Sequence, residues 1–244
     1  MTHESPAETR PPLHGFRGDA PADDGPAAHP RGLTVALSRE AGARGSVIAR
    51  KLGEILGWQV FDQELLDYLL LDDTGRGQLA ADIPPAAREW ADRHLARLQR
   101  EGRVNADPDT VAQFRLLLAV AARGDAVIVG RAAGYLLPAE STLHVRVVAP
   151  FDARVHYLAE TLRLTPDEAA DEARRRDDRR ARFLTRTLAS VPPDLAAYDL
   201  AVNSTRLGVE AAAQFIAWAL RSKQQFSGPS DAPRAADFED AAGS

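Results

Sequence analysis

Residues 33–61 read LTVALSREAGARGSVIARKLGEILGWQVF, and this stretch decides the fold class. It opens with an apolar run at residues 33–37, which has the length and composition of a short buried strand. After a turn that contains glycine, apolar side chains recur at i, i+4, i+7 and i+8 from Ile48, so they share one helical face. Gly57 marks the end of that helix, and residues 58–61 have the pattern of a second strand. The stretch therefore predicts a strand–helix–strand unit.

The alternation of strand and helix continues along the chain. Further strands are expected at residues 126–129, 143–148 and 198–202, and helices at residues 64–71, 86–100, 108–123, 153–163, 166–188 and 209–221. Residues 72–85 have the composition of a turn-rich connection, and Thr165 before Pro166 is suited to begin a helix as its N-cap. Strands that alternate with helices predict an α/β fold, with a doubly wound parallel sheet of five strands and flanking helices.

Both ends of the chain differ in composition from its middle. Residues 1–32 hold six of the sixteen prolines and a single aromatic residue, Phe16, and residues 222–244 are rich in Gln, Ser, Gly, Pro, Ala and Asp. Such segments bury too little apolar surface to offset their conformational entropy. We therefore expect a disordered tail at residues 1–32, one compact domain at residues 33–221, and a second disordered tail at residues 222–244.

Composition excludes several classes of function. The net charge of −5 argues against a general nucleic-acid or anionic-membrane binder, and the absence of cysteine excludes disulfides, thiolate metal sites and cysteine nucleophiles. The longest apolar run, residues 116–122, is far shorter than the ~20 residues that cross a bilayer. The first thirty residues lack the apolar core of a secretory signal. Three of the six histidines lie in the N-terminal tail, and the other three lack metal-ligand spacing. We expect a cytoplasmic protein with no nucleic-acid or membrane partner.

Polar residues gather where the predicted strands end. Ligands of open α/β sheets bind at the carboxyl ends of the strands, so those positions predict the site before any motif is considered. Five segments follow strands in this way: residues 38–46, 61–62, 130–131, 149–150 and 203–205. Four of the five carry groups suited to contact with phosphate or a nucleotide. Their coincidence points to a nucleotide site at this edge of the sheet.

The turn after the first strand stands where a phosphate-binding loop belongs, ahead of a helix N-terminus. The usual pattern is G-x-x-x-x-G-K-[ST]. Aligned on Ser46, this chain has Arg39 at the first glycine, Arg44 at the second and Gly45 at the lysine, with Gly42 as an extra flexible point. An ordinary turn with a surface arginine is the alternative.

A cluster of arginines occupies the helix predicted at residues 166–188. Asp177 and Asp178 offset only two of its positive charges, which leaves a local excess on an acidic protein. The cluster is either a solvated helix face or a mobile lid that closes over phosphates. Its members are Arg174, Arg175, Arg176, Arg179, Arg180, Arg182 and Arg186.

The motifs, taken together, resemble those of the cytidylate kinase-like family of P-loop proteins. The opening of that family is similar to S-R-E-x-G-x-x-G at residues 38–45 and F-D-x-E-L at residues 61–65, and it also lacks the P-loop lysine. Later motifs of the family are similar to V-I-V-G-R-A-A at residues 127–133, D-x-x-R-A-R-F at residues 177–183 and Y-D-L-x-x-N-S at residues 198–204. The resemblance covers about residues 33–220, and it implies a P-loop kinase fold.

The resemblance implies a role for each matching residue. The loop from Arg39 to Ser46, with Gly42, Arg44 and Gly45, would bind the β- and γ-phosphates of ATP, and the Ser46 hydroxyl would reach Mg²⁺.

Two further groups of residues would complete this site. Arg131 would grip a phosphate of the acceptor, for which a guanidinium is suited, unless it is a surface arginine. Arg180 and Arg182 would neutralise charge on the transferred phosphoryl group, with Asp177 orienting an arginine or the metal shell.

The chain also departs from the family. Ala132 stands where cytidylate kinases have an acidic residue, and Asp62 begins the acceptor-binding segment without the Ser-Gly that follows it in those enzymes. Cytosine specificity is therefore not expected. Asp62 could instead cap the next helix. Trp90 stands in the place of the family's acceptor-binding insertion, and it is expected to pack in the core rather than stack on a base.

The sequence thus predicts an ATP- and Mg²⁺-dependent phosphotransferase of the nucleoside monophosphate kinase type. Its acceptor would be a small phosphorylated molecule, with a nucleoside monophosphate as one candidate. The alternative is a non-catalytic nucleotide- or anion-binding regulatory module on a degenerate P-loop kinase fold. If the donor site functions, one arginine should fold over the loop and replace the missing lysine, and we expect Arg44 because it adjoins Gly45.

Overall fold

The computed structural model describes residues 32–66, 83–105, 107–189 and 195–226. Its centre is a sheet of five parallel strands in the order β2-β3-β1-β4-β5. The strands are β1 (Thr34–Arg39), β2 (Gln59–Phe61), β3 (Ala126–Val129), β4 (Thr142–Val148) and β5 (Leu200–Asn203). The prediction of a five-stranded parallel α/β sheet is confirmed.

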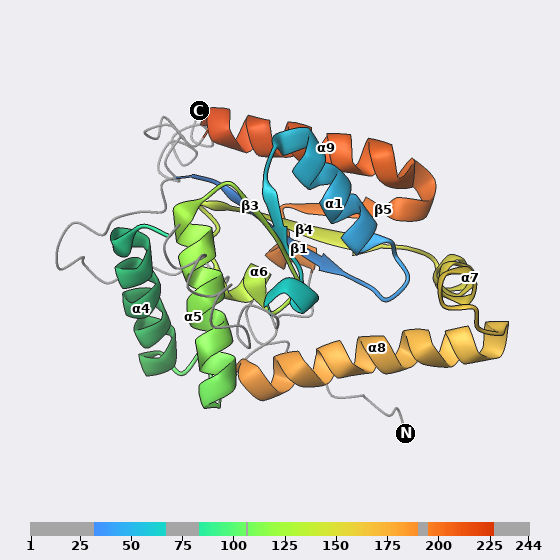
Figure 1. The fold of residues 1–244 in the computed structure, drawn as a ribbon, viewed down its shortest axis with the longest axis horizontal. Helices are drawn as coiled ribbons and strands as arrows, with labels where there is room; N and C mark the ends of the chain where they lie inside the picture. The colour runs from blue at the N-terminus through green and yellow to red at the C-terminus, as the bar shows by residue number, and fades with distance from the viewer. Residues whose placement is uncertain (1–31, 67–82, 106, 190–194, 227–244) are drawn as a thin grey trace, which may run out of the picture.

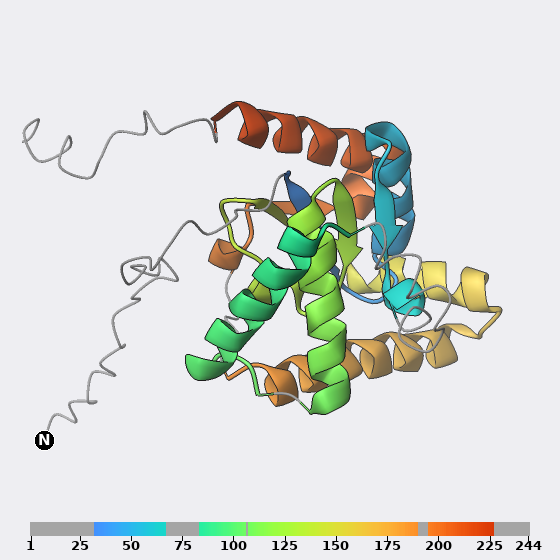
Figure 2. The ribbon, with the colours of Figure 1, turned by 60° about the vertical axis from the view of Figure 1, so that its left-hand side comes forward.

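Helices cover both faces of the sheet (Figure 1). One face packs against α1 (Gly45–Leu56) and α9 (Ser204–Phe226), and the other against α4 (Pro85–Arg100), α5 (Pro108–Arg123) and α6 (Ala133–Leu136). The chain then forms α7 (Phe151–Leu162) and α8 (Pro166–Thr187). In Figure 2, α9 lies above the sheet and α8 lies below it. The layers leave the carboxyl ends of β1, β2 and β3 facing α8.

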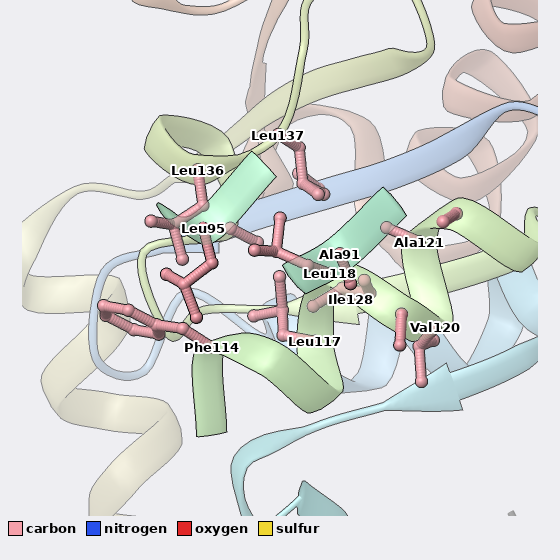
Figure 3. Packing of buried hydrophobic residues seen from close by; sticks show 14 of the residues in the cluster. Ala91, Leu95, Phe114, Leu117, Leu118, Val120, Ala121, Ile128, Leu136 and Leu137 are labelled. Atoms are coloured by element: carbon pink, nitrogen blue, oxygen red, sulfur yellow. The ribbon is translucent and has the colours of Figure 1, made fainter. Parts of the chain in front are cut away.

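Strand register sorts the apolar side chains into two cores. Ala36 of β1 pairs with Ile128 of β3, and both lie in the cluster under α4 and α5. Val35 pairs with Val127, and both lie in the cluster under α1 and α9. Figure 3 shows the first cluster, where Ile128 of β3 lies beside Ala91 of α4 and Leu118 of α5. Parallel strands buried on both faces explain their nearly continuous apolar sequences.

Local signals set several helix ends. The Thr165 side chain accepts a hydrogen bond from the Glu168 backbone, and Glu168 Oε2 accepts one from the Thr165 N–H at 2.9 Å, so α8 begins with the expected cap. Gly57 ends α1 in the left-handed conformation. Trp90 is buried and stacks on His94 with ring centroids 4.6 Å apart, which confirms its packing role.

Other elements differ from the prediction. The last helix runs to Phe226, past the expected end at Arg221, because Lys223 Nζ donates to the Thr142 carbonyl at 2.7 Å and to Asp199 Oδ2 at 2.9 Å. The short helix α6 and the 3₁₀ turn Leu195–Ala197 were not predicted.

Some predicted segments fall partly or wholly outside the described residues. Residues 63–66 are helical, whereas the rest of the predicted helix at 64–71, most of the connection at 72–85 and nearly all of both tails lie outside the described residues. Within the described part of the chain, none of the helices combines the length and apolar character that crossing a membrane requires.

Candidate phosphate-binding cleft

A cleft of about 1070 Å³ opens between the carboxyl ends of β1, β2 and β3 and the helix α8. This is the sheet edge that the strand-end rule selects. Eight arginines line the cleft against two carboxylates, Asp62 and Glu64, which leaves a surplus of six positive charges on a chain of net charge −5. We call it the arginine cleft. Its arginines are Arg39, Arg131, Arg146, Arg176, Arg179, Arg180, Arg182 and Arg186.

Six of the residues predicted from sequence lie on the arginine cleft. They come from the ends of three strands, the start of α1 and the middle of α8: Arg39, Ser46, Asp62, Arg131, Arg180 and Arg182. The predicted residues Gly42, Arg44, Gly45 and Asp177 are not among the residues that line it. The reason differs for each, and it lies in contacts between elements distant in sequence.

The turn between β1 and α1 is packed from outside the cleft. A Cβ added to Gly42, whose φ is +78°, would lie 2.5 Å from the backbone oxygen of Arg154, so this glycine permits the close approach of α7. Arg44 is exposed, and its guanidinium lies 5.0 Å from the ring centroid of Tyr157. No side chain caps α1, and in its first turn the Val47 N–H donates to the Arg44 carbonyl at 3.0 Å.

Arg39, rather than Arg44, crosses the turn. A Cβ added to Gly45 would lie 2.6 Å from Arg39 Cβ and 2.9 Å from its Cγ, so the Arg39 stem lies directly on Gly45. The guanidinium then contacts Gly130 at the end of β3. Burial, followed by the nearby charge of Arg180, lowers the pKa of Arg39 to about 10, so the side chain still carries its charge at neutral pH.

Asp177 fastens α8 to this turn. Its Oδ1 accepts hydrogen bonds from the Ala41 N–H at 2.8 Å and from Arg180 Nη1 at 3.0 Å, while Oδ2 accepts one from Arg154 Nη1 at 2.6 Å. Arg154 Nη1 also donates to the Ala41 carbonyl at 3.3 Å, and its Nε lies 3.7 Å from Glu40 Oε2. The network joins α8, α7 and the turn after β1, and it holds Arg180 at the cleft.

The arginines of α8 divide into two groups. Arg176 and Arg179 line the cleft and lie 2.6 Å and 3.6 Å from the carboxylate of Glu172 on the same helix. Arg174 and Arg175 do not line the cleft, and they pair with acidic residues one turn back. The arginine cluster of α8 thus forms a solvated face on one side of the helix and a wall of the cleft on the other.

The turn after β3 is unusual in its backbone. Gly130, Arg131 and Ala132 all have left-handed φ values, of 80°, 52° and 60°. For a residue other than glycine, this conformation costs roughly 1–2 kcal/mol. Such strain is characteristic of functional sites. Here the turn directs the Arg131 guanidinium over the ring of Phe183 from α8, 5.5 Å from its centroid.

Asp62 has the local role that the sequence offered as an alternative. Its Oδ1 accepts a hydrogen bond from the Leu65 N–H at 3.0 Å, so it caps the helical turn that follows β2. The same side chain lines the cleft and opposes the charge of Arg39. Capping and a place in the cleft are therefore compatible.

Among the polar residues of the cleft, Ser38, Tyr135, Arg146 and Tyr198 had no predicted role, and Ser38 and Tyr198 had entered only as the first residues of two family-like motifs. Arg146 Nη1 donates to Ser38 Oγ at 3.2 Å, and Ser38 Oγ donates to Tyr198 Oη at 3.2 Å. The Tyr135 and Tyr198 hydroxyls are 3.4 Å apart, and burial raises the pKa of Tyr135. The one available signal was an arginine inside an apolar strand, which the register places beside Ser38.

The donor set fits a polyanion better than a metal held by protein alone. Within the described ranges there is no group of three or more His, Cys, Asp or Glu residues that could bind a metal ion. Mg²⁺, however, usually takes only one or two protein ligands and completes its shell with phosphates and water. Ser46 and Asp62 on the cleft wall could supply those ligands. The residues present therefore fit a nucleotide with its Mg²⁺.

Fold and cleft define an α/β protein with a parallel sheet of five strands, flanking helices and an arginine-lined cleft at the carboxyl ends of its strands. The model of the Cytidylate kinase-like family matches residues 34–206, so the chain belongs to this family. Among curated proteins, none matches the chain at a significant level.

Solved structures with similar folds include an uncharacterized protein from Eubacterium ventriosum ATCC 27560, at 20% identity and a TM-score of 0.55, over 79% of this chain and 99% of that one. This likeness supports the fold alone. A shikimate kinase from Bacteroides thetaiotaomicron is similar at 15% identity and a TM-score of 0.41, over 78% of this chain and 98% of that one. A gluconokinase from Sinorhizobium meliloti 1021 is similar at 14% identity and a TM-score of 0.43, over 82% of this chain and 99% of that one.

Proposed function

We propose that the protein is an ATP- and Mg²⁺-dependent phosphotransferase of the nucleoside monophosphate kinase type, acting on a small phosphorylated acceptor. The observation that carries the proposal is the arginine cleft, with eight arginines against two carboxylates at the carboxyl ends of the strands. Phosphoryl transfer needs little covalent chemistry from the protein and depends on positioning and on neutralisation of charge. A phosphomonoester brings a charge of about −1.5 to −2, and a triphosphate brings more, so two phosphorylated ligands match the surplus.

The two ends of the cleft suit different ligands. Ser46 and the uncapped start of α1 suit the donor, because backbone N–H groups at a helix N-terminus bind phosphate. Arg131, at the strained turn after β3, suits the phosphate of the acceptor. Arg180 and Arg182 of α8 would neutralise charge between them, with Arg180 oriented by Asp177. Bound Mg²⁺ would further neutralise the phosphates.

Two observations favour a second candidate, a non-catalytic module that binds nucleotides or anions and acts through a partner. Gly45 replaces the P-loop lysine. The Ala41 N–H of the turn is also already occupied by the carboxylate of Asp177, so it is not available to a phosphate in this conformation. Such a module would bind ATP without transferring its phosphate.

Turnover with ATP, Mg²⁺ and a panel of acceptors tests the proposal, and the panel should contain nucleoside monophosphates, sugar phosphates and unphosphorylated analogues. Arg131→Ala should lower acceptor use tenfold or more, since a charge-assisted hydrogen bond contributes ~1.5–3 kcal/mol, while ATP affinity stays nearly unchanged. Arg206→Ala is the control, because Arg206 is exposed and does not line the cleft. ATP binding without turnover on any acceptor would favour the regulatory module. Absence of ATP binding would contradict the phosphotransferase and would leave the second candidate only as an anion-binding module.

A further inference from the structure

Arg39 and a lysine at position 45 exclude one another sterically. The Arg39 stem lies on Gly45 so closely that even an alanine Cβ would come within 2.6 Å of Arg39 Cβ. Packed protein interiors do not contain contacts this short between carbon atoms, so any side chain at position 45 must displace the Arg39 stem together with the backbone that carries its Cβ. The missing lysine and the path of Arg39 are therefore two aspects of one arrangement.

The Arg39 guanidinium lies between the donor end of the cleft, at the start of α1, and the acceptor end, at Arg131. The guanidinium contacts Gly130, where a side chain would occupy the same space, and the next residue is Arg131. The stem starts at the turn suited to the donor, and the charge ends beside the arginine suited to the acceptor. This is the region through which the terminal phosphate of a donor would pass.

The Arg39 guanidinium makes no hydrogen bond or ion pair with any residue that the structure describes. Its charged neighbours are Arg180 and Arg131, which repel it, and Asp62, which opposes them. A partly buried charge is normally paired, because its removal from water is otherwise unfavourable. An anion bound beside Arg39 and Arg180 would supply the partner that the described residues do not.

We propose that Arg39 replaces the P-loop lysine and binds the terminal phosphate of a nucleoside triphosphate, along a path that Gly45 leaves open. The identity of the donor rests on the proposed function. The assignment differs from the sequence-based expectation of Arg44, whose guanidinium lies over Tyr157 and away from the cleft. It also explains why glycine occupies position 45.

Calorimetric titration of Mg·ATP and Mg·ADP tests the proposal without any need for turnover. Arg39→Ala should weaken ATP binding tenfold or more, as expected for loss of a charged hydrogen bond, and should weaken ADP binding much less. Gly45→Ala should have the same effect, because its Cβ displaces Arg39. In the Arg39→Gly background, which also removes the Cβ that faces Gly45, Gly45→Ala should cause no further loss.

A rescue variant and two controls complete the design. Gly45→Lys should restore part of the lost ATP affinity in the Arg39→Gly background, where the Cβ that would lie 2.6 Å from a side chain at position 45 is also absent. Arg44→Ala and Arg50→Ala should bind ATP like the wild type, since both side chains are exposed and do not line the cleft. Thermal unfolding of each variant shows whether it is folded.

Three results would overturn the proposal: an equal loss for ATP and ADP in Arg39→Ala, additive losses in the double variant, or a loss in Arg44→Ala as large as in Arg39→Ala. If the wild type binds no ATP, the proposed function is wrong, and inorganic tripolyphosphate then becomes the probe. Tripolyphosphate binding that Arg39→Ala abolishes would retain Arg39 as a polyphosphate ligand. Binding of neither probe would overturn both proposals.

Discussion

Replacing Asp177 with asparagine should release α8 from the turn after β1. In the wild type, the Asp177 carboxylate accepts three hydrogen bonds, from the Ala41 N–H, from Arg154 and from Arg180. Asparagine has a similar shape but no charge, and its amide nitrogen cannot accept a hydrogen bond. The substitution therefore weakens the network without creating a cavity. It also removes a negative charge that balances the positive charge of Arg154, whose side chain is only 11% exposed.

The size of the effect follows from these contacts. A hydrogen bond to a charged group contributes about 1.5–3 kcal/mol, and removing one partner of a buried ion pair costs about 3–5 kcal/mol. The Asp177 side chain is 34% exposed, so solvent screens part of this interaction. We therefore expect a loss of about 2–3 kcal/mol in the free energy of unfolding. For a domain of this size, that corresponds to a decrease of about 5–10 °C in Tm.

Thermal unfolding by circular dichroism at neutral pH measures the change, and limited trypsin digestion reports on α8. Asp178→Asn is the matched control, because Asp178 is exposed on the same helix and has no hydrogen bond with a described residue. We expect the Tm of the control to stay near the wild-type value and the arginines of α8 to be cleaved faster only in Asp177→Asn. Equal Tm values for the two variants would refute the idea that Asp177 fastens the helix.

Three further predictions concern stability. Lys223→Met should lower the free energy of unfolding by about 1–2 kcal/mol in urea titrations, because the wild-type amine bonds a β4 carbonyl and an aspartate ahead of β5. Burial lowers the pKa of His94, so the unfolded state takes up more protons as the pH falls through about 6.5, and stability should fall on acidification from about pH 7.5 to 5.5. His94→Gln should reduce that slope and leave the part due to His144, whose pKa burial also lowers. Arg163→Gly should raise Tm slightly, by relief of roughly 1 kcal/mol, because the exposed Arg163 ends α7 with a left-handed φ of 56°, and an unchanged or lower Tm would contradict this account.

The sequence determined the elements whose signals are local. The α5 helix and the β3 strand match their predicted bounds because Asp107 caps the helix, Pro108 occupies its first position and Gly124 follows its end. The alternation of such elements was enough to predict the parallel sheet. The strand-end rule then located the cleft, and Arg39, Ser46, Asp62 and Arg131 all line it.

Only the tertiary structure decided where individual side chains lie within that cleft. Because Arg44 adjoins Gly45, the sequence favoured Arg44 as the side chain that folds over this glycine. In the structure, the Arg44 guanidinium lies over Tyr157 of α7, and the stem of Arg39 covers Gly45 instead. The register of β1 and β4 joins Arg146 to Ser38, and no local pattern reports that pairing. The physical reason is common to these cases: periodicity reports which face of its own element a residue occupies, whereas the direction of a loop or strand-end side chain depends on contacts with elements distant in the chain.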